Sequence, residues 1–206
     1  MKVGPRYKIC KRLGSSVFEK CQTQKFVLSE SRRNAVRRTT GRRPRAASDY
    51  GKQLLEKQRV RLTYGLTEKQ LVRYVRSAGS LKGGNASTVL LQALETRLDN
   101  VVFRLGLAPT RRAARQMVSH GHIRVNTKRA TIPSYHIQEG DNISIREGSR
   151  DGVLFSELGE YLKEHSMPAW LSFDENKLEG SIKNLPTEET VATQLDLTVI
   201  LEFYSR

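Results

Sequence analysis

The sequence predicts an α+β fold, in which a helical domain is joined to a module with a small antiparallel sheet. Apolar residues recur at three- and four-residue spacing through most of residues 48–120, which is typical of amphipathic helices. In "HIRVN" (122–126) and "ISI" (143–145) the pattern becomes a strict alternation, which is typical of half-buried strands. We expect residues 1–48 to be poorly structured alone, because segment 29–48 has paired arginines, a Gly, a Pro and few large apolar groups and should become ordered on a partner.

Three helices are predicted in the first half of the periodic region. Ser48 is the N-cap of the first, which ends at Gly65, and Thr67 is the N-cap of the second, which ends at Gly79. Leucines and valines form one wide apolar stripe over residues 86–105, which predicts a third and longer helix.

A short helix is predicted after Pro109, with Thr110 as its N-cap and Gly121 at its end. Its inner face is formed by small and apolar side chains: Ala113, Ala114, Met117 and Val118.

The last third of the chain predicts the rest of the sheet. Gly140 and Asp141 form a turn before a strand, and residues 156–165 favour one more helix. A hairpin is predicted about Asp174–Lys177, and the final "LDLTVILEFYSR" fits either a strand or a helix. These elements predict a basic extension (1–44), a helical domain (45–90, completed by 186–206) and a sheet-containing module (91–185, with its core at about 97–157).

The charge is distributed unevenly along the chain. The 206 residues carry a formal net charge of +15, and the sequence pI is about 10.2. Residues 1–50 hold 14 Lys and Arg against 3 Asp and Glu, residues 51–130 hold 16 against 4, and residues 131–206 hold 6 against 14. A polycation of this size favours a nucleic acid or an anionic membrane surface as partner.

Membrane and secretory classes are not favoured. The opening "MKVGPRYKICKRLG" lacks an apolar segment of the kind found in signal peptides, and no apolar run reaches the length of a membrane span. Two cysteines, Cys10 and Cys21, suit a reducing compartment. We therefore expect a cytosolic or equivalent location and no membrane partner.

The segment "RLDNVVFRLGLAPTRRAARQMVSHGHIRVN" (97–126) holds six arginines and one carboxylate, Asp99. Helical spacing places Arg97 and Arg104 on one face of the predicted 86–105 helix. It places Arg111, Arg112 and Arg115 opposite the apolar face of the next helix, where alanine should cost little stability. Guanidinium groups match phosphate oxygens, so we expect a clamp for an RNA backbone. A merely solubilising charged helix is the alternative.

Segment 97–126 resembles the small RNA-binding module of the ribosomal protein S-four family. "GPRYKICKRLG" resembles the opening of the bacterial members, "SDYGKQLLEKQ" their first long helix and "EFYSR" their C-terminus. The resemblance covers nearly the whole chain and is of the bacterial or organellar type. It implies the α+β fold with a helical domain, the module with its small sheet and a basic N-terminal extension.

The resemblance also implies a function. Members are structural proteins of the small ribosomal subunit that bind its RNA first, at the five-way helical junction of the 5′ domain, and nucleate assembly there. They lie near the mRNA entry tunnel beside ribosomal proteins three and five of the small subunit, and they influence decoding fidelity. An RNA-binding regulator that represses its own message is the alternative.

The RNA-binding candidates come from all three predicted parts of the chain. They are Arg6, Lys8, Arg12, Arg32, Arg33, Arg37, Arg38, Arg42, Arg43, Arg45, Tyr50, Lys57, Arg61, Arg97, Arg111, Arg112, Arg115, His120 and Lys128.

An enzyme is not expected. The same module accompanies catalytic domains in pseudouridine synthases, and "TRLDN" resembles their Arg-Leu-Asp motif, but the 50 residues after the module cannot supply a catalytic domain. No phosphate-binding glycine loop occurs. Some family members bind zinc through four cysteines, whereas this chain has two, so we expect neither a metal nor a cofactor.

Overall fold

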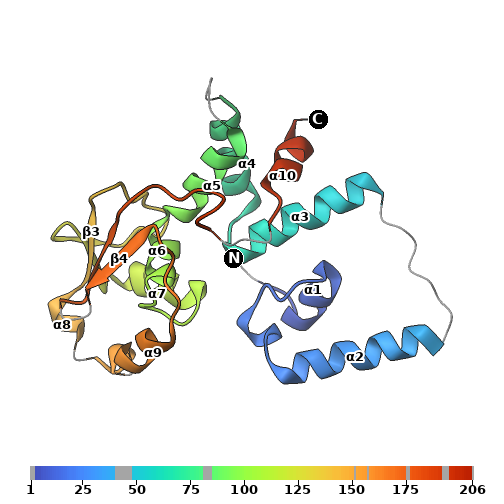
Figure 1. The fold of residues 1–206 in the computed structure, drawn as a ribbon, viewed down its shortest axis with the longest axis horizontal. Helices are drawn as coiled ribbons and strands as arrows, with labels where there is room; N and C mark the ends of the chain where they lie inside the picture. Colours follow the sequence, from blue (N-terminus) through green and yellow to red (C-terminus); the bar gives the residue numbers. More distant parts are fainter. Residues whose placement is uncertain are drawn as a thin grey trace. The chain divides into compact units, whose positions relative to one another are not determined.

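The computed structural model describes residues 3–39, 48–80, 85–150, 152–156, 158–174, 177–191 and 195–205. Within them, helices accompany a five-stranded antiparallel sheet, which confirms the predicted α+β class (Figure 1). The chain forms two compact units, residues 1–79 with 195–206 and residues 80–194. The predicted division into segments 1–44, 45–90 with 186–206, and 91–185 stays a prediction about which parts fold independently.

The first unit begins with helices where the sequence favoured a disordered segment. They are α1 (Arg6–Leu13), the 3-10 turn η1 (Glu19–Cys21) and α2 (Gln24–Thr39). Cys10, Cys21 and Phe26 form a small buried core, which Tyr7, Val17 and Phe18 partly cover. The expectation of disorder is wrong for these described residues, because widely spaced apolar residues meet once the chain folds back on itself.

The rest of the first unit is a group of helices with the predicted caps. They are α3 (Asp49–Thr63), α4 (Glu68–Ser80) and α10 (Leu197–Tyr204). The Ser48 hydroxyl accepts a hydrogen bond from the Gly51 amide at 3.2 Å. Thr67 and Gln70 cap α4 reciprocally, since the Gln70 amide donates to the Thr67 hydroxyl and the Thr67 amide to the Gln70 side chain.

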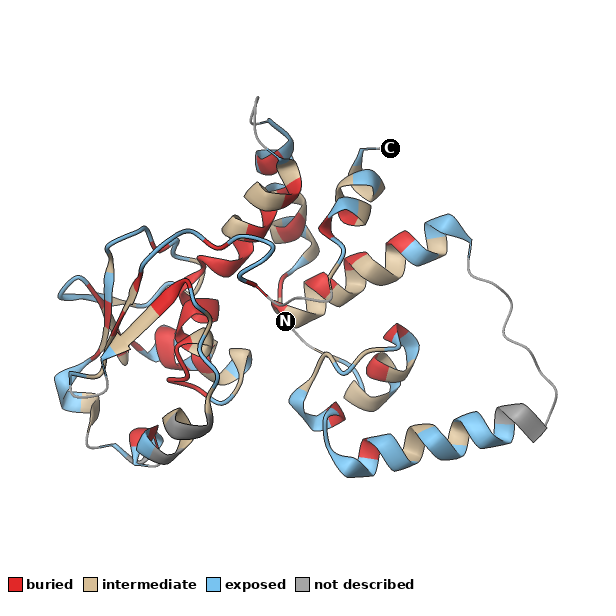
Figure 2. Cartoon of the chain, in the orientation of Figure 1, coloured by how far each residue is buried: buried red, intermediate tan, exposed pale blue. Residues whose placement is uncertain are grey.

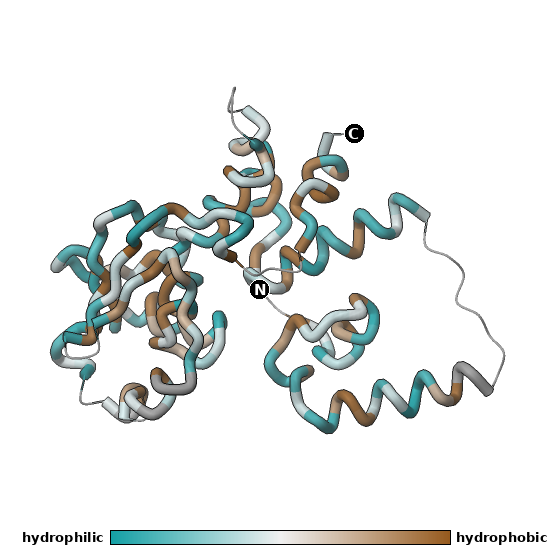
Figure 3. The backbone as a smooth tube through the Cα atoms, in the orientation of Figure 1, coloured by the Kyte–Doolittle hydropathy of each residue, from teal (hydrophilic) through white to brown (hydrophobic). Residues whose placement is uncertain are grey.

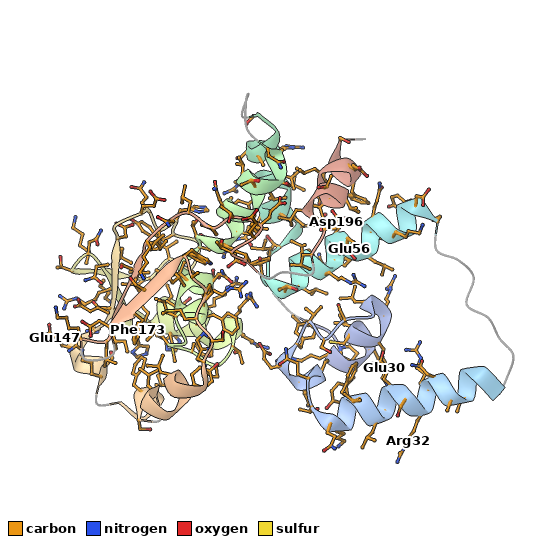
Figure 4. The ribbon with its side chains drawn as sticks, viewed as in Figure 1. Glu30, Arg32, Glu56, Glu147, Phe173 and Asp196 are labelled. Carbon is orange, nitrogen blue, oxygen red and sulfur yellow. The ribbon has the colours of Figure 1, made fainter. Side chains whose placement is uncertain are left out.

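The ambiguous C-terminal segment is a helix. α10 packs against α3, and its Leu197 and Ile200 are buried (Figure 1). Glu56 on α3 and Asp196, the N-cap of α10, are labelled close to each other in Figure 4. The last residues of the chain therefore complete the core of a unit that begins at its N-terminus.

The second unit begins with two helices in place of the predicted single helix over 86–105. α5 (Ala86–Glu95) and α6 (Leu98–Arg104) are separated at Thr96 and Arg97, and α7 (Arg111–His120) follows. Arg97 is extended and forms an antiparallel bridge with His136. The Leu98 amide donates to the Tyr135 carbonyl at 2.8 Å, and the Ile137 amide to the Thr96 carbonyl at 2.9 Å. The single-helix prediction is wrong because residues 96–98 pair through their backbone with residues 135–137. The apolar periodicity continues across the break, so the sequence does not reveal it.

The sheet has the strand order β2-β1-β3-β5-β4, and every neighbouring pair is antiparallel. The strands are β1 (Ile123–Val125), β2 (Lys128–Ala130), β3 (Asn142–Ile145), β4 (Leu171–Asp174) and β5 (Glu179–Ile182). Between β3 and β4 lie α8 (Glu147–Arg150), the 3-10 turn η2 (Val153–Phe155) and α9 (Leu158–Glu164). These elements confirm the predicted strands, the helix within 156–165 and the hairpin.

The core of the second unit lies where α6 and α7 pack with the sheet. Figure 2 shows the buried residues concentrated there, and Figure 3 shows hydrophobic residues at the same place. Ile123, Ile143 and Ile145 are at most 1% exposed, as the alternation predicts. The predicted inner face of α7 is buried at Ala114, Met117 and Val118.

Gly180 should be irreplaceable in this core. A Cβ atom at Gly180 on β5 would lie 2.7 Å from both terminal methyl carbons of Leu105. We expect Gly180→Ala to lower the free energy of unfolding by about 1–3 kcal/mol, as overpacking does. Gly159→Ala, in α9 with open space around it, is the matched control and should be neutral or stabilising. Urea denaturation measures both, and equal midpoints would contradict the packing.

Candidate nucleic-acid interface

A buried carboxylate joins the break between α5 and α6 to helix α7. Arg97 binds Asp99 through two parallel contacts, Nε to Oδ1 at 3.1 Å and Nη2 to Oδ2 at 2.9 Å. Arg115 approaches the same carboxylate from α7, with Nε 2.8 Å and Nη2 2.6 Å from Oδ2. The side chains of Arg97 and Asp99 are 2% and 4% exposed, so this ion pair is shielded from water.

A second set of polar contacts runs beside the first. Glu95, which is fully buried, accepts hydrogen bonds from Arg104 at 2.9 and 3.0 Å and from the side-chain Nδ2 of Asn100 at 2.7 Å. The side-chain Oδ1 of Asn100 in turn accepts from Arg111 Nε at 2.8 Å. The guanidinium of Arg111 also lies 4.4 Å from the centre of the Phe103 ring. Side chains from α5, α6 and α7 are therefore held in one fixed arrangement.

These contacts change the roles predicted for four arginines. The predicted shared outer face of Arg97 and Arg104 is wrong, because Arg97 is buried beside Asp99 and Arg104 binds Glu95. Arg112 leaves α7 opposite its packed face, as predicted, whereas Arg111 and Arg115 lie at the border of that face and bind inward, so the predicted outward position is wrong for these two. Because of these contacts, we now expect alanine at these two positions to cost more stability than at an exposed position.

The outward surface of the module lies on α7 and the β1–β2 hairpin. Arg112, His120 and Lys128 are exposed, and Arg115 is one-third exposed at its side chain. Asn126 and Thr127 form the two-residue hairpin turn with positive φ angles of 47° and 72°. This turn directs the cationic residues of β2 to solvent.

The Arg129 guanidinium ties the hairpin to the end of α7. It donates to the His120 carbonyl at 2.9 Å and lies against Gly121, whose φ of 75° ends the helix. The hairpin and α7 therefore present their cations from one rigid surface.

The first unit contributes a different kind of cation. Lys57 is buried, its Nζ lies 2.8 Å from Glu68 Oε1, and it faces the Phe203 ring at 4.6 Å. Arg61 Nη1 lies 3.5 Å from Glu68 Oε2. The Tyr204 hydroxyl donates to Glu68 at 2.6 Å. Lys57 and Arg61 thus join α3, α4 and α10 around one carboxylate.

The pKa values within this group follow its geometry. Burial raises the pKa of Glu68, but the hydrogen bonds from Lys57 and Tyr204 and the charges of Lys57 and Arg61 outweigh it, so the net pKa is below the ordinary value. Burial and the hydrogen bond to Glu68 raise the pKa of Tyr204. Glu68 therefore stays charged and Tyr204 protonated at neutral pH.

The N-terminal candidates are distributed along helical surfaces. Lys8, Arg12, Arg32 and Tyr50 are exposed, whereas Arg6 and Arg33 are half-buried. Arg32 points away from α2 (Figure 4). The side chains of Arg37 and Arg38, and all of Arg42, Arg43 and Arg45, lie outside the described residues.

Sequence reasoning missed three exposed cations on α4: Lys69, Arg73 and Arg76. Their spacing of four and three residues, opposite the apolar stripe of Leu71 and Val75, was the available signal. It also missed the roles of Glu95 and Asn100, because nothing local in "LETRLDN" distinguishes a buried carboxylate from a solvated one.

No metal centre is formed by the side chains that the structure describes, since no three His, Cys, Asp or Glu residues gather there. Cys10 and Cys21 are free and buried. Burial, followed by the contact with Cys10, raises the pKa of the Cys21 thiol to about 12.

Among the described residues, no helix is long and apolar enough to cross a membrane.

Removal of the shared carboxylate should destabilise the second unit. Asp99→Ala leaves Arg97 buried without its bidentate partner, and we expect a loss of about 3–5 kcal/mol of unfolding free energy. Arg112→Ala, on the exposed side of the same helices, should change it by no more than about 0.5 kcal/mol. Urea denaturation midpoints compare the two, and similar losses would contradict this assignment.

The contacts of Glu68 should make the stability of the first unit depend on pH. Because its pKa is lowered on folding, its contribution is present above the ordinary value of 4.5 and is lost as the pH falls through the folded value. Glu68→Gln should therefore be less stable at pH 7, and it should lose less stability than the wild type between pH 5 and 3. Denaturant titrations across this range measure the difference, and parallel pH profiles would contradict it.

Comparison with known proteins adds independent evidence to this geometry. Two family models match adjoining parts of the chain, the "Ribosomal protein S4/S9 N-terminal domain" over residues 2–95 and the "S4 domain" over residues 96–143. The chain is 41% identical to small ribosomal subunit protein uS4 of Halothermothrix orenii and 43% identical to that of Ligilactobacillus salivarius, each across 98% of both proteins. It is also 47% identical to protein uS4c of Rhodomonas salina, over 85% of the chain and 87% of the relative. Near full-length similarity of this degree, together with the two matching domains, shows that the chain belongs to the uS4 family of small ribosomal subunit proteins.

Proposed function

We propose that this small-subunit ribosomal protein binds ribosomal RNA at the five-way helical junction of the 5′ domain and nucleates assembly there. The coarser role is that of its family: a structural, non-enzymatic component of the small ribosomal subunit that binds ribosomal RNA. The observation that carries the finer proposal is the fixed cationic surface of α7 and the β1–β2 hairpin.

The mechanism is neutralisation of phosphates where several RNA helices converge. The major groove of an A-form helix is too narrow for side chains to read, so shape and backbone contacts dominate over base contacts. Arg111 and Arg115 are held by Asn100 and Asp99, and little side-chain entropy is lost when they meet a phosphate. Arg112, His120 and Lys128 extend the same contact surface.

The exposed cations of the first unit contact RNA elsewhere around the junction in this proposal. Lys8, Arg12 and Arg32 are exposed on α1 and α2, and Tyr50 offers a ring for stacking near the start of α3. Lys57, Arg61 and Arg97 are reassigned to structural roles, because each is directed to a carboxylate within its own unit.

The proposal extends to the neighbourhood of the mRNA entry tunnel. Ribosomal proteins three and five of the small subunit are the proposed protein neighbours, and contacts with mRNA and an influence on decoding fidelity follow from that position. The acidic last third of the chain supports contact with other ribosomal proteins. It holds 14 carboxylates against 6 cations, and this excess of negative charge would attract a basic neighbour.

Binding to an RNA fragment that contains the junction should depend steeply on salt. Six to ten phosphate contacts reduce affinity by roughly three to five decades between 50 and 200 mM salt in the duplex-DNA estimate, and RNA should be somewhat less steep. Titrations at several salt concentrations measure the slope, and a nearly flat plot would contradict phosphate neutralisation. A continuous RNA duplex of equal length is the control, and it should bind more weakly.

Met117→Asp tests the packed face of α7, which RNA binding requires to be folded. It places a charge on the packed face and should lower the unfolding midpoint first, with RNA binding lost as a consequence.

Co-sedimentation of the chain with small subunits tests the ribosomal role. A chain that does not sediment with small subunits, or that binds only its own message, would favour the alternative of an RNA-binding regulator that represses its own message.

A further inference from the structure

Helix α4 has two opposite faces of different chemistry. Leu71, Val75 and Ala78 are buried on one side. Lys69, Arg73 and Arg76 are exposed on the other, at the same spacing of four and three residues. At 3.6 residues per turn, the two stripes are about 180° apart around the helix axis. The apolar stripe is buried, whereas the cationic stripe (Lys69, Arg73 and Arg76) is exposed.

The cationic stripe differs from the cations of α3, each of which lies within ion-pair distance of a carboxylate. Lys52 lies beside Asp49, Lys57 and Arg61 beside Glu68, and Arg59 beside Glu56. Among the residues that the structure describes, no carboxylate lies within ion-pair distance of Lys69, Arg73 or Arg76. A stripe of three uncompensated charges therefore remains on one helix face.

The surface between these side chains forms a hollow and also carries charge. The residues that line a shallow hollow of about 450 Å³ are Glu68, Lys69, Val72, Arg73, Arg76 and Ser77. The Glu68 carboxylate in this lining is already paired with Lys57 and Arg61 and accepts a hydrogen bond from Tyr204. Val72 supplies an apolar contact between the cations.

We propose that the cationic stripe of α4 is a further contact for the sugar–phosphate backbone of helical RNA. The inference rests on the proposed RNA-binding function and adds a site on α4 to the contacts proposed for α1, α2 and α3. Residues 69 and 76 are about 10 Å apart along the helix axis, at 1.5 Å per residue. At the rise of about 3.4 Å per phosphate in one strand of duplex DNA, that length spans about three phosphate steps.

The residue types fit this ligand. The two arginines can each bind a phosphate through two parallel N–H groups, and Lys69 adds a point charge at the end of the stripe. Val72 is suited to an apolar contact with a ribose lying in the hollow. No base edge needs to be read, so the contact should be insensitive to sequence.

The test compares three variants of the full chain on the same junction RNA. The first, Lys69→Gln/Arg73→Gln/Arg76→Gln, removes the stripe. The second, Lys69→Arg/Arg73→Lys/Arg76→Lys, keeps its charge. The third, Arg146→Gln/Lys177→Gln/Lys183→Gln, removes three exposed cations from the acidic last third of the chain. Urea midpoints of all three should match the wild type, because each change lies on exposed side chains.

We expect the first variant to flatten the plot of log affinity against log salt by about two to three, close to one per lost contact. The second variant should keep the wild-type slope, and the third should change it by less than one. A first variant with the wild-type slope would overturn the stripe as an RNA site and leave the proposed function standing. A wild-type chain with a flat slope would overturn both. Equal flattening by the first and third variants would show a general effect of net charge and would also overturn the site.

Discussion

The carboxylate of Asp99 is the interaction on which the rest of the module depends. It is buried, it binds Arg97 in a bidentate geometry, and it receives Arg115 from the next helix. Desolvation makes such a carboxylate costly unless its partners are well placed, so the positions of α6 and α7 and of the break before α6 are specified together. Glu95 repeats this arrangement with Arg104 and Asn100. Two buried carboxylates thus fix a surface that is otherwise cationic.

The cations in the described parts of α3, α4, α6 and α7 and in the break before α6 therefore fall into three groups. Arg97 and Lys57 are buried and neutralised, and they hold helices together. Arg111 and Arg115 bind inward while their side chains still reach the surface. Arg112, Lys69 and Arg73 are exposed on the outer faces of α7 and α4. A net charge of +15 does not reveal this division, although the division decides how many charges remain for an anionic partner.

Local chemistry in the sequence predicted much of the fold. Ser48, Thr67 and Thr110 cap helices as expected, because a hydroxyl before an apolar stripe satisfies amides only a few residues away. The break at Thr96 and Arg97 could not be predicted in this way, since its backbone partners lie near residue 136.

The candidate site had the same limit. The arginines could be identified in the sequence, but the contact between Asp99 and Arg115, which are sixteen residues apart in the chain, could not. Apolar periodicity reports which face is buried, and it does not report whether a cation on the other face has a carboxylate beside it.

The placement of α10 has a consequence for the order of synthesis. The first unit needs residues 195–206 to cover α3, and Tyr204 and Phe203 to enclose Lys57. The whole second unit, residues 80–194, is made in between. At a synthesis rate of about 5–20 residues per second, roughly 6 to 23 seconds pass between synthesis of the N-terminal helices and synthesis of the helix that covers them. The second unit is contiguous and is free to fold first, so the part of the chain that is made earliest is the last to be completed.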